Sequence, residues 1–221
     1  MGELAKAWTI GFQSPRPSLL NASQELLQGI ITLKHMAVNS LENTFPWTRH
    51  NFDANASFGV DPFVLADYYL VPFQSAIAGG GARGIMCSYN AVLVSRGAKE
   101  RRGFLPPKQC SSPKQLPFLA VLLQGKPTCL SPLIRNARRQ WNFQGYVTSD
   151  SDSVANAYSS PSVGGGGHGY PAGMSNDKRK GAAVALALKD GQCDVNSGDS
   201  YNSYLLDAVA AGKKDPRPVR V

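Results

Sequence analysis

Residues 145–150 read Gly-Tyr-Val-Thr-Ser-Asp, a short β-branched run that follows a glycine and ends in two polar residues. Runs of this length and composition are typical of buried strands. The same pattern occurs at 29–33, as Gly-Ile-Ile-Thr-Leu, and at 84–87, as Gly-Ile-Met-Cys. A shorter run, Cys-Asp-Val, lies at 193–195. We therefore expect three buried strands and a fourth, shorter one at these positions.

Helical segments are predicted between and after these strands. Asp61 and Pro62 are typical of an N-cap and a first turn, Pro72 should kink the helix, and Gly79-Gly80-Gly81 should end it. Further helices are expected at 131–141, with Leu133, Ala137 and Trp141 on one face, at 178–190 and at 204–211. Strands that alternate with helices predict an α/β fold of parallel units, with both faces of the sheet covered.

Polar side chains follow each of the three longer strands where the strand ends. Lys34 and His35 follow the first strand, Ser88-Tyr89-Asn90 the second and Ser149-Asp150 the third. The carboxyl ends of parallel strands form one rim, where α/β folds and β/α barrels place their chemistry. One such group alone is more simply explained as a loop residue that caps the next helix. Three successive groups favour a functional site at this rim.

The composition is that of a globular chain, since 43% of its 221 residues are apolar and 17% are charged. The net charge of +8 comes from two segments: 94–124 carries six basic residues and one acidic residue, and 213–221 carries four and one. Because the basic residues lie in these two segments and not on a continuous face of the fold, nucleic-acid binding is only a rival interpretation. No apolar run approaches the ~20 residues that cross a bilayer. Met1–Lys6 does not have the pattern of a signal peptide.

Neither a metal site nor a cofactor is expected. The four cysteines, at 87, 110, 129 and 193, form no Cys-x-x-Cys pair, and the three histidines are widely spaced. Four cysteines in a chain of this length do not form a disulfide scaffold either.

Five blocks of sequence, taken in order, carry a resemblance to a known family. They are Lys34-His35 with Leu41-Glu42-Asn43, Phe52-Asp53-Ala54 with Gly59-Val60-Asp61, 86–92, 141–150 and 183–189. Together they resemble the N-terminal catalytic domain of glycoside hydrolase family 3, in particular its plant and fungal β-xylosidases and related β-glucosidases. The resemblance implies a (β/α)8 TIM-type barrel, of which residues 1–221 would form one partial domain, about the C-terminal half.

The resemblance also implies the chemistry, a retaining hydrolysis of β-linked xylosides or glucosides from cell-wall-type polysaccharides. Asp150 would be the nucleophile that forms a covalent glycosyl-enzyme, while a second carboxyl ~5–5.5 Å away protonates the leaving oxygen. Lys34 and His35 match residues that bind sugar hydroxyls, and Met86 and Tyr89 match residues that line the same subsite. The implied substrate is an oligosaccharide or an aryl or alkyl β-glycoside.

The two residues after Asp150 favour a xylosidase-type pocket. Ser151 stands where many β-glucosidases of the family carry Trp, and xylosidase-like members have a small residue there followed by an aspartate, as Asp152 is here. We interpret Asp152 as a structural hydrogen-bond acceptor rather than a second catalytic group.

The resemblance places further parts of the enzyme outside this chain. These are the first barrel strands and a C-terminal domain that usually supplies the acid/base, so no acid/base residue is assigned and we expect this chain alone to show no turnover. The family branch is typically extracellular or in the secretory pathway. A non-catalytic carbohydrate-binding remnant of the same fold remains the alternative.

Residues 94–124 interrupt the family pattern, which is nearly restored when 88–93 is joined to 125–129. Valine codons begin with GT and a glutamine codon can be CAG, so Val94 and Gln124 fit the two ends of a retained intron. A surface insertion at the rim is the other interpretation. With the segment removed, the resemblance implies a disulfide between Cys87 and Cys129 and leaves Cys110 and Cys193 unpaired.

Overall fold

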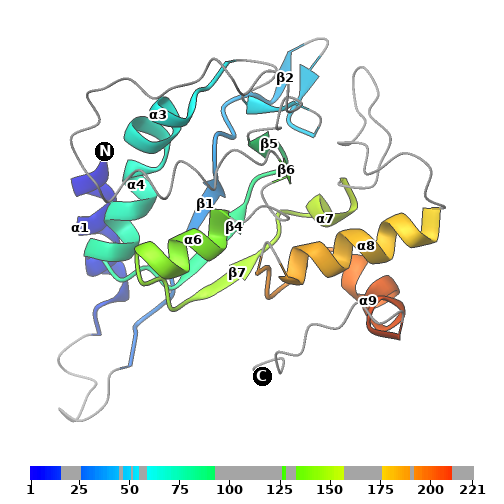
Figure 1. The fold of residues 1–221 in the computed structure, drawn as a ribbon. Helices are drawn as coiled ribbons and strands as arrows, with labels where there is room; N and C mark the ends of the chain where they lie inside the picture. The colour runs from blue at the N-terminus through cyan, green and yellow to red at the C-terminus, as the bar shows by residue number, and fades with distance from the viewer. Residues whose placement is uncertain are drawn as a thin grey trace.

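The three longer strands expected from the sequence form one parallel sheet. The computed structural model describes residues 1–15, 26–44, 47–50, 52–54, 59–92, 126–127, 133–156, 176–189 and 192–210. In it β1 (Thr32–Met36), β4 (Gly84–Cys87) and β7 (Tyr146–Thr148) lie in the order β1-β4-β7 (Figure 1). At the expected fourth strand, Val195 forms a single parallel bridge with Thr148. The predicted α/β fold with a parallel sheet is confirmed.

The first strand lies further along the chain than expected. It spans Thr32–Met36, so that Lys34 and His35 belong to the strand instead of following it. The reason lies at the preceding residue: the amide of Ile31 donates to the side chain of Gln13 at 3.1 Å, and pairing with β4 starts only at the next residue. The rim position of the polar pair is kept, because both residues lie near the carboxyl end of β1.

Glycines mark the starts of β4 and β7 because neighbouring strands leave no room for a side chain. The hydroxyls of Thr32 and Tyr146 meet across Gly84 at 2.5 Å, and a Cβ at Gly84 would lie 2.5 Å from Oγ1 of Thr32. A Cβ at Gly145 would collide with the backbone carbonyl of Arg83. The glycine-first pattern of the sequence therefore reflects close approach across the sheet.

The helix predicted from Asp61 onward is built from four consecutive pieces. They are α3 (Pro62–Val64), η2 (Leu65–Tyr69), α4 (Val71–Gln74) and η3 (Ser75–Gly79). Asp61 caps the start, accepting a hydrogen bond from the amide of Val64 at 2.8 Å. Leu70 separates η2 from α4 and Pro72 lies in the first turn of α4, where the kink was expected. Gly81 follows its end with a φ of 71°.

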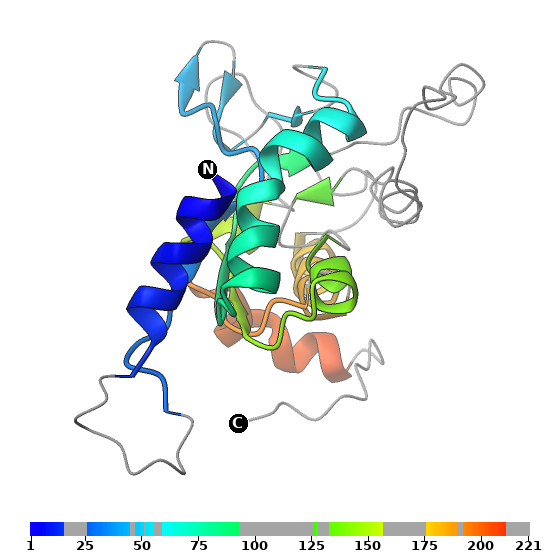
Figure 2. The same cartoon turned by 90° about the vertical axis from the view of Figure 1, so that its left-hand side faces the viewer.

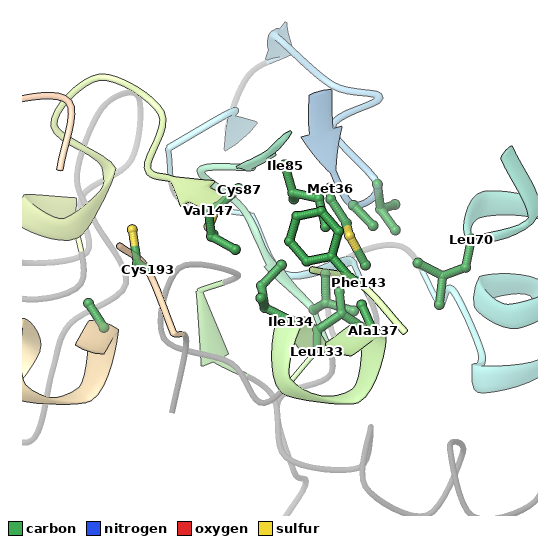
Figure 3. Close-up of a cluster of buried hydrophobic side chains, with 14 of the residues drawn as sticks. Met36, Leu70, Ile85, Cys87, Leu133, Ile134, Ala137, Phe143, Val147 and Cys193 are labelled. Atoms are coloured by element: carbon green, nitrogen blue, oxygen red, sulfur yellow. The ribbon is translucent and has the colours of Figure 1, made fainter. Parts of the chain in front are cut away.

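The hydrophobic core lies between the sheet and α6 (Leu133–Gln140). Figure 3 shows Ile85, Cys87 and Val147 of the strands beside Leu133, Ile134 and Ala137 of the helix. The predicted helix face is confirmed, because Leu133, Ala137 and Trp141 are 1%, 0% and 6% exposed. Between the buried Ile85 and Cys87, Met86 is only half-buried, and Tyr146 is 36% exposed. On the same face Thr148 is 8% exposed, so this face is partly covered, and the covering of both sheet faces stays a prediction.

An N-terminal helix, α1 (Gly2–Gln13), was not expected from the sequence. It packs along α4 and η3 (Figures 1 and 2). Its buried face holds polar residues, since Thr9 and Gln13 are 1% and 4% exposed, while Leu4 and Trp8 are 62% and 71% exposed. This distribution is the reverse of an ordinary amphipathic helix, so hydrophobic periodicity gives no signal.

The remaining elements complete the described part of the chain. α7 (Ser153–Asn156) follows β7, and α8 (Asn176–Lys189) packs against α9 (Ser200–Ala210). α9 begins four residues before the expected helix at 204–211. Two short antiparallel pairs are formed by β2 (Asn43–Thr44) with β3 (Trp47–Thr48), and by β5 (Ala91–Val92) with β6 (Lys126–Pro127).

Several expectations concern residues outside the described part. The interrupting segment 94–124, the basic tail 213–221, Cys110 and Cys129 all lie there. Cys87 is completely buried at the end of β4. Its pairing with Cys129 stays a prediction.

Candidate active site

Asp150, His35 and Tyr89 come together at the carboxyl ends of three neighbouring strands. Asp150 lies two residues beyond β7, Tyr89 two residues beyond β4, and His35 next to the last residue of β1. Oδ2 of Asp150 lies 3.2 Å from Nε2 of His35, and the two side chains are 14% and 22% exposed. The parallel order of the strands thus brings predicted site residues from distant parts of the sequence into contact.

The ring of His35 is held at both nitrogens. Nδ1 lies 3.2 Å from Nδ2 of Asn39, while Nε2 faces Asp150. Burial lowers the pKa of His35; the Asp150 carboxylate opposes this effect and the Lys34 ammonium adds to it. The ring is therefore neutral at neutral pH. With an amide N–H at Nδ1, its one proton lies on Nε2 and donates to the carboxylate.

The carboxylate of Asp150 is also held by the chain that follows it. Its Oδ1 accepts a hydrogen bond from the amide of Ser151 at 2.8 Å, and its carbonyl accepts from the amide of Ser153 at 3.1 Å. The preceding Ser149 is fully buried, and its Oγ accepts from the Asn196 side chain at 3.1 Å and from the Ser197 amide at 2.8 Å. These bonds fix the direction in which the acid group points.

Tyr89 is buried beside the same segment, with 5% of its surface exposed. Its hydroxyl donates to the carbonyl of Ser151 at 2.5 Å. The Arg49 guanidinium lies over its ring, 4.9 Å from the centroid, and the His50 ring meets it edge-on with centroids 4.4 Å apart. Such contacts stabilise a buried aromatic ring. Tyr89 therefore links β4 to the residue directly after Asp150.

The other two residues of the Ser88-Tyr89-Asn90 group hold the rim together. The Ser88 amide donates to the carbonyl of Met36 at 3.0 Å. The Ser88 hydroxyl and the Asn90 side chain both donate to the carbonyl of Ala37, at 3.0 and 3.1 Å. Both residues are buried. Their role is to join the ends of β4 and β1, which keeps Tyr89 and His35 on the same rim.

Lys34 and Met86, the other two predicted site residues, flank this cluster without a described bond to Asp150. Lys34 is exposed, and its charge acts on the neighbouring His35. Met86 is half-buried opposite Thr148 of β7. Both positions are compatible with the edge of a ligand site.

Four residues at the site were missed by sequence reasoning. Arg49 and His50 contact Tyr89, Asn39 contacts His35, and the Asn156 side chain lies 3.0 Å from Nδ1 of His50. Arg49 and His50 follow a two-residue strand, too short for periodicity to reveal. The available signal was their position just before the Phe52-Asp53-Ala54 block.

The described residues contain no group of three or more His, Cys, Asp or Glu side chains arranged to hold a metal ion. None of the helices described is both long and apolar enough to cross a membrane.

Curated sequences similar to the chain are β-xylosidases. No family model matches it. It is 30% identical over 214 residues to the Arabidopsis thaliana protein named "Probable beta-D-xylosidase 7", covering 96% of this chain and 22% of that protein. It is 26% identical over 215 residues to an exo-1,4-β-xylosidase of Aspergillus niger, covering 94% and 20%. The chain thus spans about a fifth of the length of these relatives.

Solved structures with a similar fold are glycosidases. A GH3 exo-β-xylosidase, in complex with a xylobiose aziridine activity-based probe, matches 96% of this chain and 21% of its own, with a TM-score of 0.62 and 22% identity. A β-glucosidase from Listeria innocua, in complex with isofagomine, matches 97% and 22%, with a TM-score of 0.56 and 19% identity. These matches concern the fold.

Proposed function

The chain is homologous to a segment of the β-xylosidases of glycoside hydrolase family 3, and on this premise we propose that its rim carries the nucleophile of a retaining β-glycosidase. The observation that carries the proposal is the position of Asp150, just beyond β7 and 3.2 Å from His35 of β1. A carboxylate held at the carboxyl ends of parallel strands suits this chemistry. The xylosidases among the relatives support β-xylosides as substrates, and the β-glucosidase structure supports β-glucosides as the second class.

In the proposed reaction, Asp150 attacks the anomeric carbon of the sugar. A bond forms between its carboxylate oxygen and that carbon as the bond to the leaving oxygen breaks, and the electron pair goes to the leaving oxygen, which takes a proton from a second carboxyl group. Water then hydrolyses the glycosyl ester. We propose that the proton donor lies in a part of the enzyme outside this chain.

The neighbouring residues have binding roles in this proposal. His35, neutral and donating through Nε2, can turn from the carboxylate to a sugar hydroxyl when substrate enters. Lys34, exposed beside it, would bind a second hydroxyl. Met86 and Tyr89 would form the wall of the subsite, and the contact of Tyr89 with Ser151 would keep the nucleophile in place.

The wider architecture in this proposal is a β/α barrel of which the described sheet is one part. Three parallel strands with a helix-covered core on one side and the half-buried Met86 on the other are compatible with an arc of such a barrel. The small Ser151 after Asp150 supports a xyloside pocket. An extracellular or secretory location belongs to the same proposal.

The test uses a substrate that needs no acid catalyst. A 2-deoxy-2-fluoro-β-xyloside with a dinitrophenolate leaving group transfers its sugar without protonation, so the experiment can be done on this chain. We expect mass mapping to find the fluorosugar on Asp150, and Asp150→Asn to reduce labelling by about 10³-fold or more. Asp152→Asn is the matched control and should label normally.

The outcome separates the enzyme from its alternative. Label on Asp152 or Asp194 would overturn the assignment of the nucleophile. No label, together with xylose-dependent NMR shifts at the rim, would favour a carbohydrate-binding remnant without catalysis. The matching 2-fluoroglucoside tests the sugar preference.

A further inference from the structure

His50 occupies a fixed position at the end of the β2–β3 pair. The neighbouring Arg49 is anchored to Glu42 by a backbone hydrogen bond of 2.7 Å and by a side-chain ion pair of 3.4 Å. The amide of His50 donates to Oγ1 of Thr48 at 3.3 Å. These bonds place the His50 ring between two elements, the end of β4 and the helix α7.

The ring of His50 contacts both of these structures. It meets the ring of Tyr89 edge-on at 4.4 Å, and its Nδ1 lies 3.0 Å from the side-chain amide of Asn156, the last residue of α7. Tyr89 in turn donates to the carbonyl of Ser151. His50 is therefore connected to both ends of the segment 151–156, which directly follows Asp150.

We propose that His50 is a positioning residue of the site: it holds Tyr89 and Asn156 together and thereby fixes the segment on which Asp150 lies. The functional meaning of this inference rests on the proposed role of Asp150. The contacts of His50 with Tyr89 and Asn156, which we call the link, do not depend on that role. Within the segment, the amides of Ser153 and Ala155 donate to backbone carbonyls at 3.1 and 2.9 Å, and these bonds report on its order.

The link requires a neutral ring. Burial and, after it, the Arg49 guanidinium lower the pKa of His50, against smaller opposing effects of Asp150 and Glu42. Nε of Arg49 lies 3.4 Å from Nε2 of His50 and can only donate, so Nε2 must be the acceptor. The proton then lies on Nδ1, and it bonds to Asn156 when that amide, whose Nδ2 lies 3.0 Å away, turns its oxygen toward the ring. A second proton on the ring would lie on Nε2, where its N–H would face the N–H of Arg49 and the hydrogen bond between them would be lost.

The first experiment measures amide hydrogen exchange by NMR on the full 221-residue chain. In His50→Ala we expect the protected amides of Ser153 and Ala155 to exchange about tenfold faster than in the unmodified chain, since about one hydrogen bond's worth of local stability is lost. Asn156→Ala should give a similar change. Amides of β4 should stay as they are. The matched control is Asn202→Ala, at an exposed position of α9, which should change neither region.

A second readout separates positioning from simple packing. His50→Phe keeps an aromatic edge against Tyr89 but has no titrating nitrogen. Between pH 8 and pH 5 the backbone shifts of 151–156 should follow a histidine titration in the unmodified chain and in His35→Gln. Because His35 also titrates and contacts Asp150, the deciding comparison is the double variant His35→Gln/His50→Phe, in which that titration should be absent.

The two experiments can overturn the proposal separately. Unchanged exchange at Ser153 and Ala155 in a folded His50→Ala variant would show that His50 holds nothing in place. If His50→Ala does not fold, the double variant decides: a titration of 151–156 that persists in His35→Gln/His50→Phe contradicts the link. Failure of the fluorosugar to label Asp150 would instead remove the proposed function and leave these results unaffected.

Discussion

Gln13 at the amino end of the β1-β4-β7 sheet and Asp150 at its carboxyl end make different kinds of contact. At the amino end, side chains bond to the backbone: Gln13 accepts from the amides of Ile31 and Arg83 at 3.1 and 3.3 Å and donates to the carbonyl of Gly81 at 2.9 Å. At the carboxyl end the contact between Asp150 and His35 joins two side chains, beside the bonds that Ser88 and Asn90 donate to the Ala37 carbonyl. The first arrangement satisfies groups that every strand must satisfy. The second joins groups that a ligand could also engage.

This difference predicts different consequences of substitution. Replacing Gln13 removes the partner of the partly buried amides of Ile31 and Arg83 and of the Gly81 carbonyl, so stability should fall. At the carboxyl end, the side chains of His35 and Asp150 are 22% and 14% exposed. If one of them is removed, water or a sugar hydroxyl can therefore take its place as the hydrogen-bond partner of the other. Substitutions at the amino end should therefore affect folding, and those at the carboxyl end chiefly reactivity, as stability–function trade-offs lead one to expect.

The largest effect on stability is expected for Gln13→Leu. The apolar side chain fills a similar volume but leaves two backbone amides and one carbonyl without their partner. We expect the free energy of unfolding to fall by about 3 kcal/mol, as measured by urea denaturation.

Gln28→Leu is the matched control, because Gln28 is exposed and its replacement should change stability by less than about 0.5 kcal/mol. Gln13→Glu should fall between the two, since it keeps the acceptor and loses the donor to Gly81. If Gln13→Leu costs no more than the control, the amino end does not have the structural role assigned to it.

A smaller effect is expected for Arg138→Met, also at the amino end. Arg138 donates to the carbonyl of Gly145 at 2.7 Å and to Asp194 at 2.8 Å, and lies 5.1 Å from the ring centroid of Phe143. Met keeps the apolar stem, and the ion pair is partly exposed, so we expect a loss of about 1–2 kcal/mol by urea denaturation. Arg139→Met, at the exposed next position, should have almost no effect. An equal loss in both variants would contradict the assignment.

The sheet could be predicted from the sequence because its signals are local. Gly84 and Gly145 mark strand starts, and Asp61 with Pro62 marks a helix start. α1 could not be predicted, since its exposed side carries Trp8 and its buried side carries polar groups that bond to distant backbone. The boundary of β1 was wrong for the same reason: a side chain from another element, Gln13, takes the amide that would have begun the strand.

At the site, the residues that end strands could be anticipated and those that hold them could not. Asp150 and Tyr89 follow recognisable strands, whereas Asn39 and His50 lie in short connections and Asn156 ends the four-residue helix α7, all too short for a periodic pattern. Contacts between His50 and Asn156 depend on how three connections fold over one rim. Such contacts are set by tertiary packing, which local sequence does not encode.

The smallest expected effect is a pH dependence of stability caused by histidines at the carboxyl end. It also separates the two ends best. Burial lowers the pKa of both His35 and His50 in the folded chain. Above pH ~6.5 both rings are neutral in the folded and the unfolded chain and contribute nothing. As the pH falls below this value the unfolded chain takes up protons first, so stability decreases until the folded pKa values are passed.

Urea denaturation between pH 8 and pH 5 should show a shallower decrease in His35→Gln and in His50→Gln. Gln13→Leu should keep the full slope at a lower stability. A slope that stays the same in both variants would mean that neither histidine is held neutral at the rim.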